Sequence, residues 1–159
     1  MIVLFLTYYR DQNIMMKPKD YEVAGMKYRI PTVFITYDIE NDSELKDALV
    51  SEAEQTDSLF EVLSVSTKGD YADESWVKAT RREIDAVDKL VVILGPDTHT
   101  DLRVAREVKL GMECNKPIVQ LRIQGTNPRP MPMHKWNWVY IWEQKAFIQL
   151  FRPIEVLDH

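Results

Sequence analysis

The pattern of hydrophobic and polar positions is most regular between residues 90 and 114. Five apolar residues in a row, Leu90 to Leu94, are followed by Gly95-Pro96, a threonine-rich turn and an amphipathic segment. This order is typical of a buried strand that leads into a helix. In open α/β sheets, ligands bind beyond the carboxyl ends of the strands. We therefore expect the loop 95–101 and the first turns of the following helix to form one wall of any active site.

The same alternation of strand and helix patterns extends along most of the chain. Runs rich in β-branched, aliphatic and aromatic residues predict strands at 31–38, 60–66, 90–94, 118–123 and 138–142. Amphipathic helices are expected to begin near Asp42, near Ser75, after the threonine-rich turn and at Glu143. Strands that alternate with helices predict right-handed crossovers and a parallel sheet covered on both faces. The expected fold class is α/β, a three-layer flavodoxin-like arrangement with five parallel strands in the order 2-1-3-4-5.

Residues 1–30 do not follow this pattern. The apolar run from Ile2 to Leu6 is too short to cross a membrane and lacks a signal-peptide leader, so neither export nor membrane anchoring is expected. We interpret 1–30 as an N-terminal extension whose first residues can form an added strand, and 31–159 as one domain. An exposed strand edge at the start of the chain suggests self-association as a homodimer or larger assembly.

Composition narrows the function classes. The net charge of −5 and the pI near 5.2 argue against a nucleic-acid partner. One cysteine, Cys114, excludes an internal disulfide and fits a reducing cytoplasm. The glycine-rich fingerprints of dinucleotide folds and P-loops are absent, and the histidines do not have the spacing of a metal site. We therefore expect a cytoplasmic protein without a metal.

Several motifs occur together in a characteristic order. They read VFITYD at 33–38, SWV at 75–77, IDAVDKLVVILG at 84–95, THTDLRVAREV at 98–108 and KPIV at 116–119. Over about residues 31–123 the chain resembles the TIR-like family that includes the sensor subunit of bacterial Thoeris anti-phage systems. The resemblance implies a TIR-like fold and, in enzymatic members, a glutamate essential for cleaving the nicotinamide glycosidic bond of NAD. Glu107 matches that position, and Arg103 stands where many relatives have tryptophan.

The chemistry gives Glu107 an independent rationale. Breaking the bond between ribose and nicotinamide builds positive charge on the ribose, and a buried carboxylate stabilises that charge more than it stabilises the substrate. NAD would then be a substrate, with no further cofactor. The alternative is a surface salt bridge, because Arg103 and Glu107 are four residues apart on one helix face. Such pairs contribute only about 0.3 to 0.5 kcal/mol.

Residues after the first and second predicted strands complete the candidate pocket. We expect Tyr37, Asp38, Ser66 and Lys68 to bind substrate beside Glu107, with the Tyr37 ring stacking on a flat group and Asp38 accepting a hydrogen bond. The structural alternatives are that Tyr37 only closes the sheet edge and that Asp38 only caps a turn. Trp76 is assigned to the core because of its helical spacing.

Two functions from different classes follow from the sequence. The first is an NAD glycohydrolase or cyclase that makes a cyclic ADP-ribose-type signal for a downstream effector, in response to a phage-derived trigger, as the resemblance implies. The second is a non-catalytic TIR-like module that binds a nucleotide or another protein. Measuring nicotinamide release from NAD separates the two.

Overall fold

The computed structural model describes residues 20–133 and 138–157. The apolar start of the chain, on which the expected added strand depends, lies outside these residues. The strands are β1 Asp20–Val23, β2 Met26–Arg29, β3 Thr32–Thr36, β4 Glu61–Val65, β5 Lys89–Leu94, β6 Ile118–Arg122, β7 Val139–Ile141 and β8 Ile154–Val156. The helices are α2 Ser43–Ala53, α3 Glu74–Asp85, α4 Leu102–Glu113 and α5 Gln144–Leu150, and η1 Thr98–Thr100 is a 3₁₀ turn.

The main sheet has five strands in the order β4-β3-β5-β6-β7. All four neighbouring pairs are parallel. In the numbering of the sequence analysis this order is 2-1-3-4-5, so the predicted flavodoxin-like α/β fold is confirmed. The central strand β5 is buried from Leu90 to Leu94, as its unbroken apolar run predicted.

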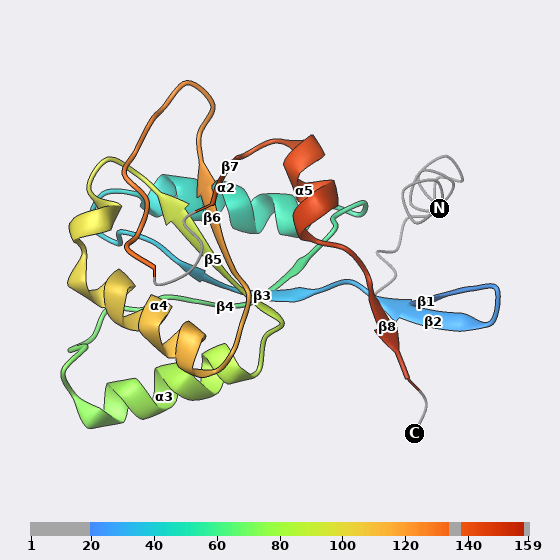
Figure 1. Cartoon of the computed structure of the whole chain (residues 1–159), viewed down its shortest axis with the longest axis horizontal. Helices are drawn as coiled ribbons and strands as arrows, with labels where there is room; N and C mark the ends of the chain where they lie inside the picture. The colour runs from blue at the N-terminus through green and yellow to red at the C-terminus, as the bar shows by residue number, and fades with distance from the viewer. Residues whose placement is uncertain (1–19, 134–137, 158–159) are drawn as a thin grey trace.

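Helices cover the sheet on both faces (Figure 1). On one face, Val33 and Ile35 of β3 pack in a core cluster with residues of α2 and α5. On the other face, Phe34 packs with residues of α3 and α4. Successive side chains of a strand point to opposite faces, so the parity of a residue in β3 decides which helices it meets. Thr36 has the parity of Phe34 and therefore belongs to the α4 face.

Local sequence accounts for the position of α4. The Asp101 carboxylate accepts hydrogen bonds from the backbone amides of Arg103 at 2.9 Å and Val104 at 3.2 Å, which caps the helix. Asn115, with φ of 56°, takes the left-handed conformation that commonly ends a helix. A Cβ on Gly111 would lie 2.8 Å from Leu90 Cδ2, so the glycine lets α4 approach β5 closely.

A second, antiparallel sheet has the order β1-β2-β8 and projects to one side of the main body in Figure 1. The sequence analysis found no regular element in residues 10–29 and none after Pro153, and the structure corrects this at 20–29 and 154–156. The signal was weak because each strand of the hairpin is only 4 residues long. Gly25, with φ of 82°, closes the turn between them.

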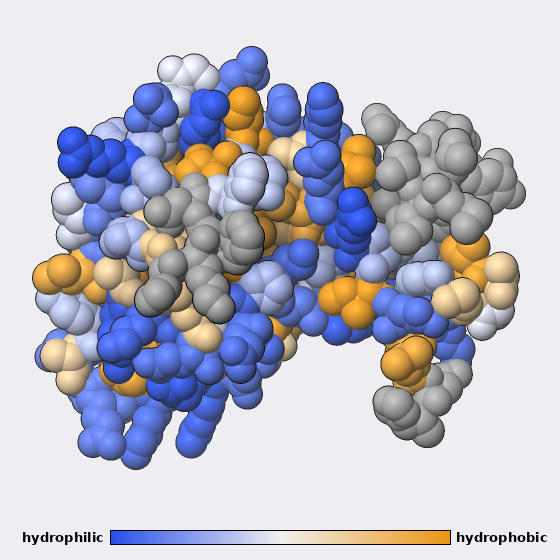
Figure 2. Space-filling model, viewed as in Figure 1, coloured by the Kyte–Doolittle hydropathy of each residue, from blue (hydrophilic) through white to orange (hydrophobic). Residues whose placement is uncertain are grey.

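The outer surface of α3, at the lower left of Figure 2, is largely hydrophilic. Thr80 and Ile84 are the buried residues of this helix, which is the one-sided pattern of a helix that covers a sheet. Among the helices formed by residues 20–133 and 138–157, none has the length and apolar content needed to cross a membrane.

Candidate functional site

Glu107 lies at the centre of a buried polar cluster on the α4 face of the sheet. Its side chain has no exposed surface. One carboxylate oxygen accepts a hydrogen bond from the Ser66 hydroxyl at 2.6 Å, and the other accepts one from the Thr36 hydroxyl. Thr36 ends β3 and Ser66 follows β4, so the cluster stands at the carboxyl ends of two neighbouring strands. This is the edge at which α/β folds bind ligands.

Burial dominates the electrostatics of this carboxylate. It raises the pKa of Glu107 to about 7, although the hydrogen bonds from Ser66 and Thr36 and the charge of Arg103 act in the opposite direction. A glutamate with a pKa near neutrality changes its charge within the physiological pH range. Such a perturbed carboxyl at the ligand-binding edge of a sheet is typical of a functional group.

Arg103 is also part of this cluster. Its guanidinium lies 3.5 Å from the Glu107 carboxylate, donates to the Ser66 hydroxyl, and donates to the Tyr37 carbonyl oxygen at 2.8 Å. The Arg103 side chain is 10% exposed, whereas that of Glu107 is not exposed at all. The surface salt bridge considered from the sequence is therefore a buried pair, because the helix face that carries both residues packs on the sheet.

Tyr37 and Asp38 differ in their relation to Glu107. The Tyr37 ring packs in the core cluster on the α2 and α5 face, the same face as Val33 and Ile35 of β3. Only the Tyr37 carbonyl oxygen contacts Arg103. The expected stacking surface is thus turned away from Glu107. The buried Asp38 carboxylate accepts from the Glu40 amide at 3.1 Å and the Asn41 side chain at 2.7 Å, so it caps the turn after β3.

Lys68 and Trp76 lie outside the buried cluster. The Lys68 side chain is 75% exposed and forms an ion pair with Glu40 at 3.5 Å. Trp76 is half-buried and does not belong to either core cluster, which corrects its assignment to the core. Its indole packs on the backbone of the loop before α3, where a Cβ on Gly69 would lie 2.2 Å from Trp76 Cδ1. Of the expected site residues, the structure brings together Glu107, Ser66 and the Tyr37 carbonyl.

Thr36 and Arg103 are the cluster members that the sequence analysis did not place in the pocket. Two signals were present: Thr36 is the polar last residue of a buried strand, and Arg103 is one helical turn before Glu107. Neither signal shows that Thr36 and Arg103 both contact the Glu107 carboxylate, because this contact depends on how α4 lies across the sheet.

A second buried carboxylate, Asp42, lies near the ends of β3 and β5. Burial and the charge of Asp38 raise the pKa of Asp42, while a hydrogen bond with Thr98 lowers it. A Cβ on Gly95 would lie 2.1 Å from the Asp42 carboxylate, so a larger residue here would force that carboxylate to move. The sequence analysis treated Asp42 only as a helix start, but its side chain makes no capping hydrogen bond.

The described part of the chain, residues 20–133 and 138–157, contains no group of three or more His, Cys, Asp or Glu side chains placed to hold a metal ion. The chemistry available at the Glu107 cluster is that of one carboxylate, two hydroxyls and one guanidinium. This set can stabilise a developing positive charge and accept hydrogen bonds from sugar hydroxyls.

The fold and the cluster define a class of protein, a flavodoxin-like TIR-like domain with a buried glutamate on the helix after the third strand of the parallel sheet. The family model described as Thoeris protein ThsB, TIR-like domain, matches residues 34–128, which is more than half of the chain. The chain belongs to this family, and the resemblance drawn from its motifs is confirmed. No curated protein matches the chain.

Three solved structures are similar to the chain at low identity. The TIR domain of the Toll-related receptor TRR-2 from Hydra magnipapillata has a TM-score of 0.47 and 16% identity, covering 75% of this chain and 90% of that domain. A 3-dehydroquinate dehydratase-like protein from Bifidobacterium longum has a TM-score of 0.38 and 15% identity, covering 75% and 89%. The CMP N-glycosidase BcmB from Clostridium botulinum has a TM-score of 0.37 and 17% identity, covering 74% and 96%. Likeness at this level does not bear on the substrate.

Proposed function

We propose that the chain is an NAD-processing enzyme of bacterial anti-phage defence, with Glu107 as its catalytic carboxylate. The observation that carries the proposal is a fully buried glutamate with a pKa near 7, held by Ser66 and Thr36 at the carboxyl ends of β3 and β4. Membership of the TIR-like domain family of ThsB supports the same assignment.

The proposed reaction is cleavage of the bond between nicotinamide and ribose. The electron pair of this bond moves to the nicotinamide nitrogen, so nicotinamide leaves as a neutral molecule and positive charge remains on C1′ and the ring oxygen of ribose. The ionised Glu107 stabilises this charge. Attack by water, with loss of a proton, gives ADP-ribose. Attack by an adenine nitrogen of the same molecule gives a cyclic ADP-ribose-type product, which a downstream effector would sense.

Substrate access requires a change at Arg103. Glu107 is sealed from solvent, and Arg103 is the partner of Glu107 that retains surface exposure. In the proposed mechanism the guanidinium leaves the carboxylate when NAD enters and pairs with the pyrophosphate, since guanidinium groups bind phosphate oxygens well. Ser66, Asp38 and the exposed Lys68 are proposed to bind the substrate, with the Asp38 carboxylate accepting a hydrogen bond from a ribose hydroxyl or an amide, while Tyr37 contributes its carbonyl. A phage-derived trigger or self-association would favour this open state.

A second candidate is a non-catalytic TIR-like module that binds a nucleotide or a protein. One observation favours it: both oxygens of Glu107 are satisfied by groups of the chain itself, as in a purely structural carboxylate. In this case the cluster would fix α4 on the sheet and take no part in a reaction.

The experiment that separates the candidates follows nicotinamide release from NAD by chromatography. The purified protein is assayed alone and with a lysate of phage-infected cells, and NAD binding is measured by calorimetry alongside. Nicotinamide release above the level of the lysate alone supports the enzyme. Binding of NAD without release in either condition supports the module, and neither binding nor release contradicts both nucleotide functions.

A further inference from the structure

The Ser66 hydroxyl joins the two charged members of the Glu107 cluster. It donates a hydrogen bond to one Glu107 carboxylate oxygen at 2.6 Å and accepts one from the Arg103 guanidinium. The Ser66 backbone amide donates to the Ile35 carbonyl oxygen at 2.8 Å, which fixes the residue beside the end of β3. Ser66 is 2% exposed, so this hydroxyl belongs to the interior of the site. A serine hydroxyl held by a carboxylate in this way has the geometry of an activated nucleophile.

Glu107 is oriented to act as a general base toward Ser66. Its second carboxylate oxygen accepts a hydrogen bond from the Thr36 hydroxyl, which holds the first oxygen on Ser66. A nucleophile, a base and a group that orients the base, all within hydrogen-bond reach, form the arrangement that activates serine in nucleophilic enzymes. Burial raises the pKa of Glu107 to about 7, close to the value at which a base is most effective at neutral pH.

The proposed reaction brings C1′ of the ribose beside this hydroxyl. Because Glu107 stabilises the positive charge on C1′, the two groups must be in contact, and reacting atoms in productive complexes are about 3 to 3.5 Å apart. The Ser66 oxygen is hydrogen-bonded to the same carboxylate and therefore lies within reach of C1′. A nucleophile of the chain is thus in place at Glu107 before water enters. Such positioned groups compete well with water, because they act at effective concentrations of about 10⁵ M or more.

We propose that Ser66 is an acceptor of ADP-ribose, so that the chain modifies itself while it processes NAD. This inference rests on the proposed function, because NAD supplies the ADP-ribosyl group. The bond between C1′ and the nicotinamide nitrogen breaks with its electron pair on nitrogen, and nicotinamide leaves as a neutral molecule. A lone pair of the Ser66 oxygen forms the new bond to C1′, and the Ser66 proton moves to Glu107, which later releases it to solvent. The product is an O-glycoside of Ser66, and no oxidant or further reactant is needed.

Arg103 links this modification to substrate entry. In the closed site its guanidinium occupies a lone pair of the Ser66 oxygen. When Arg103 moves to the pyrophosphate, as proposed for NAD entry, that lone pair becomes free as C1′ arrives. Thr36 is less accessible, because it ends the central strand β3 and is 0% exposed, whereas Ser66 follows the edge strand β4. ADP-ribose attached to Ser66 fills the site, so the consumption of NAD by each chain limits itself.

Intact mass spectrometry measures the modification directly. The purified protein is incubated with NAD, alone and with a lysate of phage-infected cells, and is repurified before the measurement. We expect a gain of one ADP-ribosyl group per chain, mapped by fragmentation to Ser66, and nicotinamide release that slows as the adduct accumulates. The adduct should resist neutral hydroxylamine, which cleaves ADP-ribose esters of carboxylates but not serine glycosides. Free ADP-ribose in place of NAD should give no adduct at Ser66, because its C1′ carries no nicotinamide leaving group.

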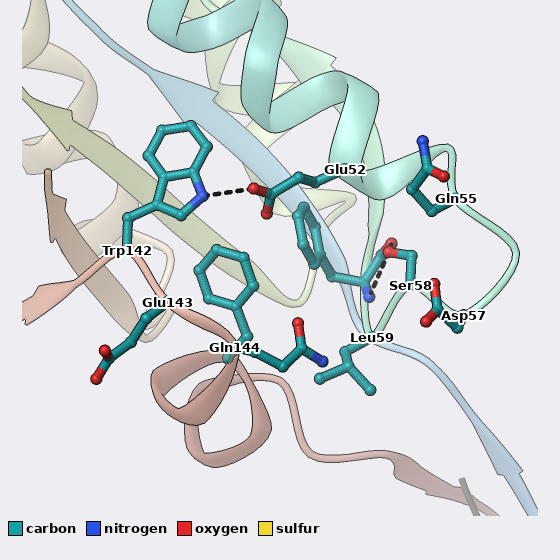
Figure 3. A pocket seen from close by; sticks show the side chains of 10 residues that line it. Glu52, Gln55, Asp57, Ser58, Leu59, Trp142, Glu143 and Gln144 are labelled. Atoms are coloured by element: carbon teal, nitrogen blue, oxygen red, sulfur yellow. Dashed lines mark hydrogen bonds between the residues drawn. The ribbon is translucent and has the colours of Figure 1, made fainter. Parts of the chain in front are cut away.

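Ser58→Ala is the matched control for Ser66→Ala. The Ser58 hydroxyl donates to the Phe60 carbonyl oxygen at 2.8 Å, and Ser58 lines a cavity of about 290 Å³ on the α2 and α5 face of the sheet (Figure 3). Ser66→Ala should slow adduct formation at least about a hundredfold, whereas Ser58→Ala should form the adduct as the wild type does. Melting temperatures show whether both variants are folded, and mapping the wild-type adduct needs neither variant.

The negative results have different meanings. Nicotinamide release without an adduct at Ser66 overturns this inference and leaves the proposed enzyme in place. An adduct confined to a carboxylate, to Thr36 or to Thr67, or one formed equally from free ADP-ribose, also overturns the inference alone. Neither release nor an adduct in either condition overturns both the enzyme and its self-modification.

Discussion

The Arg103 guanidinium lies 3.5 Å from the Glu107 carboxylate, and the Arg103 side chain is 10% exposed whereas that of Glu107 is not exposed at all. The pair joins two turns of α4 to the Tyr37 carbonyl at the end of β3. A buried charged group and its partner stabilise the fold only together, because removing one leaves the other without compensation. In the proposed mechanism, Arg103 therefore controls access of the substrate to Glu107.

Replacing Arg103 tests that relationship. Arg103→Met keeps the bulk of the side chain but removes the donors to Ser66 and Tyr37 and the positive charge beside Glu107. We expect the free energy of unfolding to fall by about 1 to 3 kcal/mol and the pKa of Glu107 to rise further. Chemical denaturation and a pH titration measure the two effects. Lys109→Met, an exposed change on the same helix, should alter stability by less than about 0.5 kcal/mol. Equal stability of the two variants would mean that the Arg103 contacts do not hold the cluster.

Replacing Glu107 tests the proposed catalysis. Glu107→Gln keeps the shape of the side chain but removes the negative charge that a positively charged transition state requires. We expect nicotinamide release to fall by a factor of at least about 100 to 1,000, with the fold retained. Glu113→Gln is the control on the same helix, where the carboxylate pairs with Arg81 at the surface. Equal turnover in all three proteins, given an active wild type, would falsify the role of Glu107.

The raised pKa of Glu107 predicts how stability changes with pH. The pKa of Glu107 is about 7 in the folded protein and near the ordinary value of 4.5 in the unfolded chain. The folded state therefore favours the protonated form. Its stabilising contribution is fully present below pH 4.5 and is lost as the pH rises through 7. Relative to Glu107→Gln, which does not titrate, the wild type should lose up to about 3 kcal/mol between these limits. Denaturation of both proteins at pH 5 and pH 8 checks this, and a pH-independent difference would contradict the burial of an ionisable Glu107.

Asp88 connects the small sheet to the main sheet. Its carboxylate accepts two hydrogen bonds from Arg29 of β2, at 2.6 and 2.8 Å, and further bonds from Thr32 at the start of β3. Burial alone would raise the pKa of Asp88, but the bonds from Arg29 and Thr32 lower it to about 2. The ionised Asp88 therefore stabilises the fold fully above its ordinary pKa of 3.8, and this stabilisation is lost as the pH falls through 2.

Asp88→Asn should lower the free energy of unfolding at pH 7 by about 1 to 3 kcal/mol, because the charge-assisted bonds to Arg29 are lost. Hydrogen exchange should show the largest gain in exchange in β1, β2 and β8. Asp85→Asn, at the exposed end of α3, is the matched control. If both variants exchange alike in the small sheet, the Arg29 contact is not what joins the two sheets.

The sequence by itself determined the main sheet. The apolar run at Leu90–Leu94 and the similar runs before and after it need burial on both faces, and the amphipathic segments between them supply the covering helices. The motifs at 33–38, 84–95 and 98–108 also identified the family and selected Glu107 as the candidate carboxylate. These features could be predicted because each depends on a short stretch of sequence. Within such a stretch, the spacing of apolar residues follows the local geometry of a strand or a helix.

Tertiary structure alone decided which side chains surround Glu107. Thr36 ends β3, Ser66 follows β4 and Arg103 belongs to α4, and they meet only because α4 lies across the carboxyl ends of β3 and β4. Because side chains alternate between the two faces along β3, the Tyr37 ring lies on the face opposite Glu107. The pairing of β2 with β8 joins residues more than a hundred positions apart. Long-range packing of this kind leaves little local periodicity, which is why the buried pair and the small antiparallel sheet appear only in three dimensions.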